Sequence, residues 1–361
     1  MNAHERFMRR ALALARKAKG KTSPNPMVGA VVVKNGAIVA EGYHKKAGDS
    51  HAEVMALDAA KEKARGASLY VTLEPCAHFG RTPPCVNRII KSGIKHVYVG
   101  MVDPNPQTNG KGIKALVDHG ISVHVGFCEA ELQKLNEIFI TYITKRRPFI
   151  TVKIAQSLDG KIATESGDSK WITSDSARAF AHRIRSQYDA IMVGINTVLR
   201  DNPRLDAWFS KKHPVKVVVD SQLSTPQNAA LLEHDRQCIV VTVPTRPGQE
   251  TENRAILSKT ARILDVKEKA GQVNLKDMMR KLAGLEISSV LVEGGGTLIG
   301  ALFDEGLVDR VMFFVSPKII GGKNAISSVM GAGASRVEKA VKLRDLTVKR
   351  IGTDFLFEGY V

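Results

Sequence analysis

The sequence predicts an α/β fold in two domains. Its 361 residues are too many for one ordinary hydrophobic core, and 43% hydrophobic with 25% charged residues is ordinary for a globular protein. Short apolar runs alternate with helical patterns along both halves, which indicates layered α/β domains whose sheets are at least partly parallel. Near 142–149, YITKRRPF interrupts this pattern with charge and a proline, so we expect domains at 1–145 and 149–361.

The first half begins with a helix, because Asn2 and Glu5 have capping-box spacing. Asn35-Gly36, between two apolar runs, marks a β-hairpin turn. Period-two apolar runs predict strands, and longer amphipathic patterns predict helices. We expect strands at 30–43 (the hairpin), 67–73, 96–101 and 121–125, and helices at 2–19, 51–65, 84–92, 110–119 and 129–141.

The second half repeats the alternation without repeating the sequence. Its end, RDLTVKRIGTDFLFEGYV, alternates as an antiparallel hairpin does. Segments rich in Pro, Thr, Asn and charge predict loops at 202–214 and 243–256. We expect strands at 149–157, 190–194, 215–220, 237–242, 288–294 and 310–316, and helices near 174–187, 275–284 and 296–305.

Composition restricts the class of protein. No run of 18 apolar residues suggests a membrane span, and the start of the chain does not read as a signal peptide, so we expect a cytoplasmic protein. Four cysteines do not make a disulfide framework. The net charge of +17 fits nucleic acid or phosphorylated small molecules. Aromatic residues are only 6% and the basic residues are spread along the chain, which does not favour a nucleic-acid surface.

A zinc centre is indicated by HAE at 51–53 and EPCAHFGRTPPC at 74–85. His51, Cys76 and Cys85 give the three protein ligands of a catalytic zinc site, which leaves a position for water. Glu53 is placed to carry the proton of that water, and H-x-E with a Pro-Cys motif is typical of nucleobase deaminases. A closed structural site with His78 as fourth ligand is the alternative.

Asn25 lies between two prolines in SPNPMVG, directly before the first strand. Its amide can both donate to and accept from an amidine-like ring edge. A turn-forming role is the alternative for an isolated Asn in such a segment.

These motifs resemble the cytidine deaminase superfamily. Eight residues separate Cys76 from Cys85, where tRNA and cytidine deaminases keep two. This spacing, with PNPMVGAVVV and HAEVMAL, resembles the deaminase half of the bifunctional riboflavin-biosynthesis deaminase/reductase family. The resemblance covers residues 1 to about 145 and implies a cytidine-deaminase-like α/β/α domain.

The second half carries other motifs: VKIAQSLDGKIAT, GDSKWITS, RIRSQYDAIMVGINTVLRDNPRL and VLVEGGGTLIG. The glycine run in the last joins a strand to a helix, where it either cradles a phosphate or makes a tight turn. It is not GxGxxG, so a Rossmann domain is not expected.

This set resembles the reductase domain of the same family, which implies a dihydrofolate-reductase-like α/β fold and NADPH. The resemblance implies substrate contacts from Lys153, which we place near the ribose, and from Ser169, Arg185, Leu205 and Glu293. It implies cofactor contacts from Ala155, Trp171, Thr197, Asp201, Ser221, Gly295, Gly296, Thr297, Leu298, Ile299, Gly300 and Ala301.

One position departs from the family pattern. An arginine that meets substrate phosphate is expected shortly after DNPxL, where this chain has Trp208. Arg204, Lys211 and Lys212 are the candidates to replace it.

The resemblance implies two successive reactions with Zn²⁺ and NADPH. The first is hydrolytic deamination of 2,5-diamino-6-(5-phosphoribosylamino)pyrimidin-4(3H)-one, and the second is reduction of its ribosyl group to give 5-amino-6-(5-phosphoribitylamino)uracil. We expect a phosphorylated pyrimidine as substrate, neither nucleic acid nor membrane as partner, and a homodimer or higher homo-oligomer. The alternatives are a nucleic-acid deaminase with an RNA-binding second half and a non-catalytic zinc module.

Overall fold

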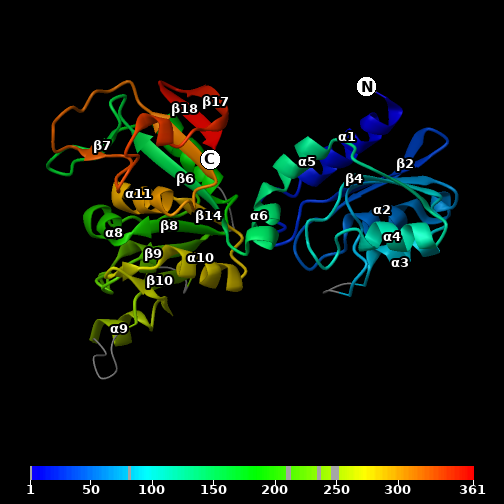
Figure 1. The fold of residues 1–361 in the computed structure, drawn as a ribbon, viewed down its shortest axis with the longest axis horizontal. Helices are drawn as coiled ribbons and strands as arrows, with labels where there is room; N and C mark the ends of the chain where they lie inside the picture. The colour runs from blue at the N-terminus through cyan, green and yellow to red at the C-terminus, as the bar shows by residue number, and fades with distance from the viewer. Residues whose placement is uncertain (1, 80–82, 209–212, 234–236, 245–251) are drawn as a thin grey trace. The chain divides into compact units, whose positions relative to one another are not determined.

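The computed structural model describes residues 2–79, 83–208, 213–233, 237–244 and 252–361. The chain divides into two compact units, residues 1–146 and 147–361. Each unit is an α/β structure with its own sheet, as the sequence predicts (Figure 1).

The first unit is built on a five-stranded sheet in the order β2-β1-β3-β4-β5. Strands β3, β4 and β5 are parallel, whereas β1 runs antiparallel to both β2 and β3. The strands are β1 (Gly29–Lys34), β2 (Ala37–Tyr43), β3 (Ser68–Leu73), β4 (His96–Met101) and β5 (Ser122–Val125). Asn35 and Gly36 both have positive φ, as the predicted tight hairpin turn requires.

Helices cover both faces of this sheet (Figure 1). They are α1 (Ala3–Arg16), α2 (Ala52–Ala60) with a 3₁₀ turn (Lys61–Ala64), α3 (Cys85–Lys91), α4 (Lys111–Asp118), α5 (Glu129–Leu135) and α6 (Glu137–Lys145). Asn2 caps α1 by accepting from the Glu5 N–H, as predicted. The α1 helix lies so close to β1 that a Cβ on Gly29 would come within 2.1 Å of the Ala11 carbonyl oxygen.

The single helix predicted at 129–141 was wrong, because two helices meet at Asn136. The buried Asn136 side chain accepts from the Met27 N–H (2.8 Å) and donates to the Met27 carbonyl (3.1 Å). Those two hydrogen bonds secure the segment that follows Asn25.

The second unit contains a nine-stranded sheet in the order β11-β10-β9-β8-β14-β6-β15-β18-β17. Its first seven strands in this order are parallel, and β18 and β17 close the edge in antiparallel fashion, as the C-terminal pattern predicts. The strands are β6 (Phe149–Gln156), β8 (Ala190–Gly194), β9 (Val215–Val219), β10 (Cys238–Thr242), β11 (Arg262–Asp265), β14 (Ser289–Val292), β15 (Arg310–Val315), β17 (Arg344–Ile351) and β18 (Asp354–Tyr360). Two small ribbons add β7 (Lys161–Ala163) with β16 (Ile326–Ser327) and β12 (Glu268–Lys269) with β13 (Gln272–Val273).

The helices of this unit pack on both faces of its sheet. They are α7 (Asp175–Arg185), α8 (Ile195–Asp201), α9 (Glu252–Leu257), α10 (Leu275–Gly284) and α11 (Gly296–Asp304), with short 3₁₀ turns at Ala230–Leu232 and Val337–Lys339. Apolar side chains of α10 and α11 share one core with β6 and β14, and those of α8 and α9 share another with β8, β9 and β10. The loop predicted at 243–256 was wrong at its end, where α9 begins; 245–251 lie outside the described residues.

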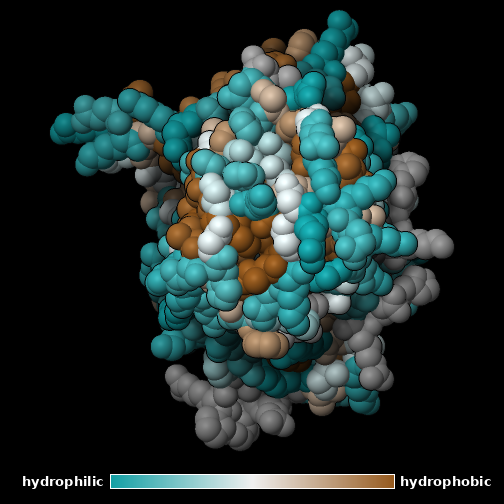
Figure 2. Space-filling view, turned by 90° about the vertical axis from the view of Figure 1, so that its right-hand side faces the viewer, coloured by the Kyte–Doolittle hydropathy of each residue, from teal (hydrophilic) through white to brown (hydrophobic). Residues whose placement is uncertain are grey.

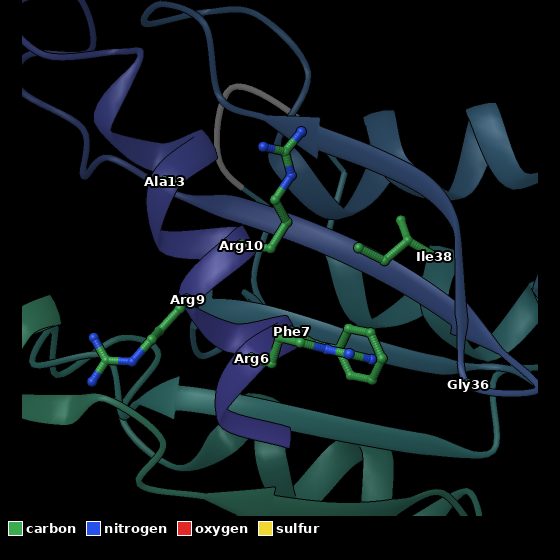
Figure 3. Close-up of a pocket in the computed structure, with 7 residues that line it drawn as sticks. All are labelled: Arg6, Phe7, Arg9, Arg10, Ala13, Gly36 and Ile38. Atoms are coloured by element: carbon green, nitrogen blue, oxygen red, sulfur yellow. The ribbon is translucent and has the colours of Figure 1, made fainter. Parts of the chain in front are cut away.

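The surface of the first unit is described by its hydropathy and by a pocket. The face in Figure 2 is largely hydrophilic, with apolar side chains gathered in one patch. In the first unit, a pocket of about 610 Å³ opens between α1 and the β1–β2 hairpin (Figure 3). It is lined by Arg6, Phe7, Arg9, Arg10, Ala13, Gly36 and Ile38. No helix in the described ranges has both the length and the apolar content that a membrane crossing needs.

Candidate active sites

Three predicted metal ligands meet in the first unit. His51 is the N-cap of α2, Cys76 follows β3, and Cys85 is the first residue of α3. The His51 Nδ1 lies 3.2 Å from the Cys85 Sγ and 3.7 Å from the Cys76 Sγ, and the ligand atoms of all three residues lie within 4.8 Å of one another. The helix starts therefore bring together ligands that are 34 residues apart in the sequence.

The donor set fits zinc. The Cys76 sulfur accepts from the Cys85 thiol, from His51 and from the Cys85 N–H, and these contacts lower the pKa of the Cys76 thiol to about 4. The pKa of the Cys85 thiol is raised, because it lies beside Cys76 and is buried. Two facing cysteines and one imidazole are the ligands that Zn²⁺ prefers, and a cation would hold both sulfurs as thiolates. Within the described part of the chain no fourth ligand joins them, because His78 instead faces the Thr108 hydroxyl at 3.4 Å.

Glu53 lies in the first turn of α2 with only 3% of its surface exposed. Burial raises the pKa of its carboxyl to about 7, although the nearby His51 opposes this rise. A carboxyl that titrates near neutrality can both take up and release a proton, which suits it to the proton-carrier role expected from the sequence.

His44 is a site residue that the sequence reasoning missed. It follows β2 directly, is buried, and its ring meets the His51 ring edge-on with centroids 5.4 Å apart. Its Nδ1 faces the Ser50 carbonyl and its Nε2 faces the Asn25 Nδ2, each at 3.3 Å. If Nδ1 carries the proton and donates to Ser50, Nε2 accepts from Asn25 and fixes that amide. The sequence signal that could have indicated His44 is its position as a polar residue directly after a predicted strand.

Glu74, directly before Pro75-Cys76, was also missed. Its carboxylate accepts the backbone N–H groups of Asp103, Gly110, Gly112 and Ile113 at 2.9–3.2 Å. The chain passes so close here that a Cβ on Gly112 would come within 1.9 Å of the Pro75 carbonyl oxygen. Glu74 therefore secures the loop after β4 against the segment that carries Cys76.

In the second unit, Lys153, Arg185 and Glu293 come together from β6, α7 and the end of β14. Arg185 donates from Nε to one Glu293 oxygen (2.6 Å) and from Nη2 to the other (3.0 Å), and the Lys153 Nζ lies 3.6 Å from Glu293. Burial raises the pKa of Glu293, but Arg185 and Lys153 outweigh it and lower the pKa to about 2. At Lys153, burial lowers the pKa of the ammonium by more than the negative charge of Glu293 raises it.

The loop after α8 contains Leu205 and the departing position 208. Leu205 is buried with a φ of +57°, and the Trp208 indole stacks on the His182 ring with centroids 3.5 Å apart. Of the candidates to replace the expected arginine, Arg204 pairs with Glu233, and Lys211 and Lys212 lie outside the described residues.

The glycine run begins α11, with Gly295 as its N-cap at a φ of +71°. Thr197 of α8 lies against it, because Cβ atoms on Gly294 and Gly295 would come 2.7 and 3.5 Å from the Thr197 Oγ1. The predicted cofactor-binding segment is thus the N-cap and the first part of this helix, beside Thr197. It consists of Gly295, Gly296, Thr297, Leu298, Ile299, Gly300 and Ala301. Backbone N–H groups at such a start can bind phosphate.

The remaining predicted residues are spread over several elements. Ala155 is on β6, Asp201 ends α8, and Ser221 follows β9, where its hydroxyl bonds Gln272 and Val273. Ser169 and Trp171 lie between β7 and α7; Trp171 is 61% exposed beneath the Arg178 guanidinium. The structure shows no hydrogen bond that joins these residues to the Lys153 cluster within its described ranges, so their ligand contacts stay predictions.

Comparison with known families identifies both halves. Residues 1–101 match the cytidine and deoxycytidylate deaminase zinc-binding region, and residues 148–357 match the RibD C-terminal domain. The chain is 47% identical to the riboflavin biosynthesis protein RibD of Aquifex aeolicus, over 97% of this chain and 96% of that protein. It is 38% identical to the Escherichia coli K12 protein of the same name, over 97% of each chain.

Solved structures agree with this result. RibD of Acinetobacter baumannii superposes with a TM-score of 0.89 at 34% identity, covering 99% of this chain and 98% of that one. A Thermotoga maritima diaminohydroxyphosphoribosylaminopyrimidine deaminase/5-amino-6-(5-phosphoribosylamino)uracil reductase superposes with a TM-score of 0.85 at 40% identity, with the same coverage.

Proposed function

Because the chain belongs to the RibD family of riboflavin biosynthesis proteins, we propose that residues 1–146 deaminate a pyrimidine and residues 147–361 reduce the product. The chain is a bifunctional enzyme, a zinc-dependent deaminase and an NADPH-dependent reductase. The substrates we assign are 2,5-diamino-6-(5-phosphoribosylamino)pyrimidin-4(3H)-one for the first unit and 5-amino-6-(5-phosphoribosylamino)uracil for the second.

The observation that carries the deaminase half is that three zinc ligands meet beside a buried carboxyl. His51, Cys76 and Cys85 would hold the metal. Zinc, when bound there, lowers the pKa of a water toward neutrality and so supplies the nucleophile. Burial raises the pKa of the Glu53 carboxyl to about 7, so this carboxyl would be able to accept a proton from the attacking water and donate one to the departing amine.

Asn25 orients the pyrimidine ring in this proposal. Its Nδ2 faces His44, so its carbonyl oxygen is left to accept from the exocyclic amine or a ring N–H of the substrate. Asn136 supports this arrangement through its two hydrogen bonds to the backbone of Met27.

Lys153 is the group that meets the ribosyl moiety in the reductase half. NADPH, when bound, would supply the hydride that reduces C1. The Lys153 ammonium lies 3.6 Å from Glu293, which leaves donors to stabilise the oxygen released when the ribose ring opens. Gly295, at the start of α11, and Thr197, which lies against it from α8, form the phosphate-binding end of the cofactor site in this proposal.

We also propose that the enzyme is a homodimer joined through its reductase units. Every residue from 329 to 350 is exposed, including Val337 at 92%, Val341 at 51%, Leu346 at 54% and Val348 at 56%. This segment includes all of the sheet's edge strand β17 except its last residue, and an open apolar edge is a liability that a second copy of the same edge would cover.

A single charge on that edge tests the dimer. Val348→Lys should convert a dimer into a monomer in light scattering at micromolar concentration, while Lys349→Glu, which changes the neighbouring side chain on the other face, should not. A wild-type enzyme that is already monomeric would refute the proposal.

The function is tested by supplying the diaminopyrimidine substrate with NADPH and measuring ammonia and NADPH together. We expect one ammonia released and one NADPH oxidised per substrate. Ammonia release without NADPH oxidation, even with deaminated substrate, would refute the reductase half. Cytoplasmic location is part of the same proposal, since the cysteine ligands must stay reduced.

A further inference from the structure

The second unit contains a buried lysine that the proposed reaction does not use. Lys216 of β9 is 6% exposed, and its neighbours on that face of the sheet include Val218 and Val240. Its Nζ donates to the Leu231 carbonyl (3.2 Å) and lies 3.3 Å from the Asp206 Oδ1. A buried ammonium is costly unless it is paired, and in the described residues Asp206 is its anionic partner.

Asp206 connects this lysine to the reductase site. Its main-chain carbonyl accepts a hydrogen bond from the Arg185 Nη1 at 2.8 Å, and the His182 Nδ1 lies 3.1 Å from the same oxygen. Its side chain is turned to Lys216. Asp206 therefore joins β9 to α7, because its side chain contacts Lys216 and its main chain contacts Arg185.

The loop around Asp206 adopts a bend that needs outside support. Leu205 has a positive φ, a conformation that a branched apolar residue adopts only when its surroundings impose it. Two side-chain contacts impose it on either side: the Lys216–Asp206 ion pair and the stack of Trp208 on His182.

Arg185 depends on this loop. Nε and Nη2 are engaged by Glu293, and Nη1 is engaged by the Asp206 carbonyl and lies 3.1 Å from His182. Three of the five guanidinium donors thus have oxygen acceptors within the protein. Arg185 acts mainly by holding Glu293, and the Asp206 carbonyl fixes the far side of the guanidinium.

These contacts form one series that runs from Lys216 through Asp206, Arg185 and Glu293 to Lys153: three of its links are ion pairs, and the link between Asp206 and Arg185 is a main-chain hydrogen bond. The strands that contribute to it, β9, β14 and β6, lie within four neighbouring positions of the sheet (Figure 1). We propose that Lys216 and Asp206 are positioning residues of the reductase, a buried pair that fixes the loop after α8 and thereby sets Arg185 and Glu293 for the substrate. This inference rests on the proposed reductase function.

The test compares Lys216→Met, Lys216→Arg and Asp206→Ala in the full-length enzyme. Lys216→Met should raise the KM for 5-amino-6-(5-phosphoribosylamino)uracil about tenfold and lower kcat severalfold, because Arg185 and Glu293 lose their set position. The KM for NADPH should stay within twofold, as should deaminase activity. Lys216→Arg, which keeps the charge, should stay within threefold of wild type.

Asp206→Ala should match Lys216→Met, and the double variant should be no worse than either single one, because both remove the same pair. Arg254→Gln is the control, since it breaks a comparable ion pair with Asp265 beside the edge strand β11. It should leave both KM values unchanged.

A structural readout is also available, because Trp171 and Trp208 are the two tryptophans of the chain. In a Trp171→Phe background, Lys216→Met should shift the emission of Trp208 as its stack on His182 loosens. If Lys216→Met fails to fold, Asp206→Ala carries the same prediction.

Unchanged substrate KM in Asp206→Ala, an equal change in the KM for NADPH, or additive effects in the double variant would each overturn the positioning role. Absence of reductase activity in the wild type would instead refute the proposed function on which it rests.

Discussion

The two active sites are assembled from sequence in different ways. In the deaminase unit the metal ligands and the proton carrier fall within 35 residues, at the starts of α2 and α3 and after β3. In the reductase unit the charged cluster draws on Lys153, Arg185 and Glu293, which are up to 140 residues apart. Zinc requires particular ligand types, and here they lie close together in the sequence, so the site leaves a local motif. A network of ion pairs requires only that opposite charges meet, so topology determines it.

The two sites also differ in the pKa of their buried carboxyl groups. Glu53 has no cation that outweighs its burial, so the pKa of its carboxyl rises to about 7. The Glu293 side chain is also buried, with 5% of its surface exposed, but Arg185 and Lys153 lower its pKa to about 2. The first carboxyl is suited to move protons, and the second is suited to stay charged and hold its partners.

The largest effect should come from Glu53→Gln, which removes the proton carrier and keeps the shape of the side chain. We expect the deaminase kcat to fall about a thousandfold, within the range for loss of a general acid–base group. Zinc content by mass spectrometry should stay at one per chain, and reduction of deaminated substrate should be unchanged.

Glu74→Gln is the companion variant, because Glu74 is a second buried glutamate two residues from a metal ligand and has a structural role. This substitution should lower the free energy of unfolding by more than it raises the activation free energy of deamination in the folded enzyme. Deamination by Glu53→Gln at the wild-type rate would show that the contrast between the two carboxyls has no mechanistic meaning.

The next effect concerns stability and follows from the low pKa of Glu293. A carboxyl whose pKa falls from 4.5 to about 2 on folding contributes about 3 kcal/mol to the free energy of unfolding above pH 5. That contribution is lost as the pH falls through the folded-state pKa. The difference between wild type and Glu293→Gln should therefore be largest near neutral pH and shrink toward pH 2.

Urea unfolding followed by tryptophan fluorescence measures this difference in the full chain, since Trp171 and Trp208 both lie in the reductase unit. Glu338→Gln, at an exposed ion pair with Arg336, should change the unfolding free energy by less than about 0.5 kcal/mol. A Glu293→Gln difference that is constant from pH 7 to pH 3 would refute the ion-pair explanation.

The sequence predicted the metal cluster and the strands of both sheets except β11, because period-two apolar runs and ligand spacing are local signals. It failed where a distant contact decides. Asn136 ends a helix because its side chain is drawn to the backbone of Met27, more than a hundred residues earlier. His44 was missed for the same reason, since only the fold brings it to Asn25 and His51.

The smallest expected effect, and the one most specific to a single hydrogen bond, concerns His44. His44→Phe keeps a ring beside His51 but removes the acceptor that faces the Asn25 amide. Loss of one such hydrogen bond is worth about 1 kcal/mol, so the deaminase KM should rise about five- to tenfold, with zinc content and reductase activity unchanged. His44→Gln should restore part of the affinity, because its amide oxygen can accept from Asn25. If both variants lose zinc, His44 supports the metal ligands and does not orient the substrate-binding amide.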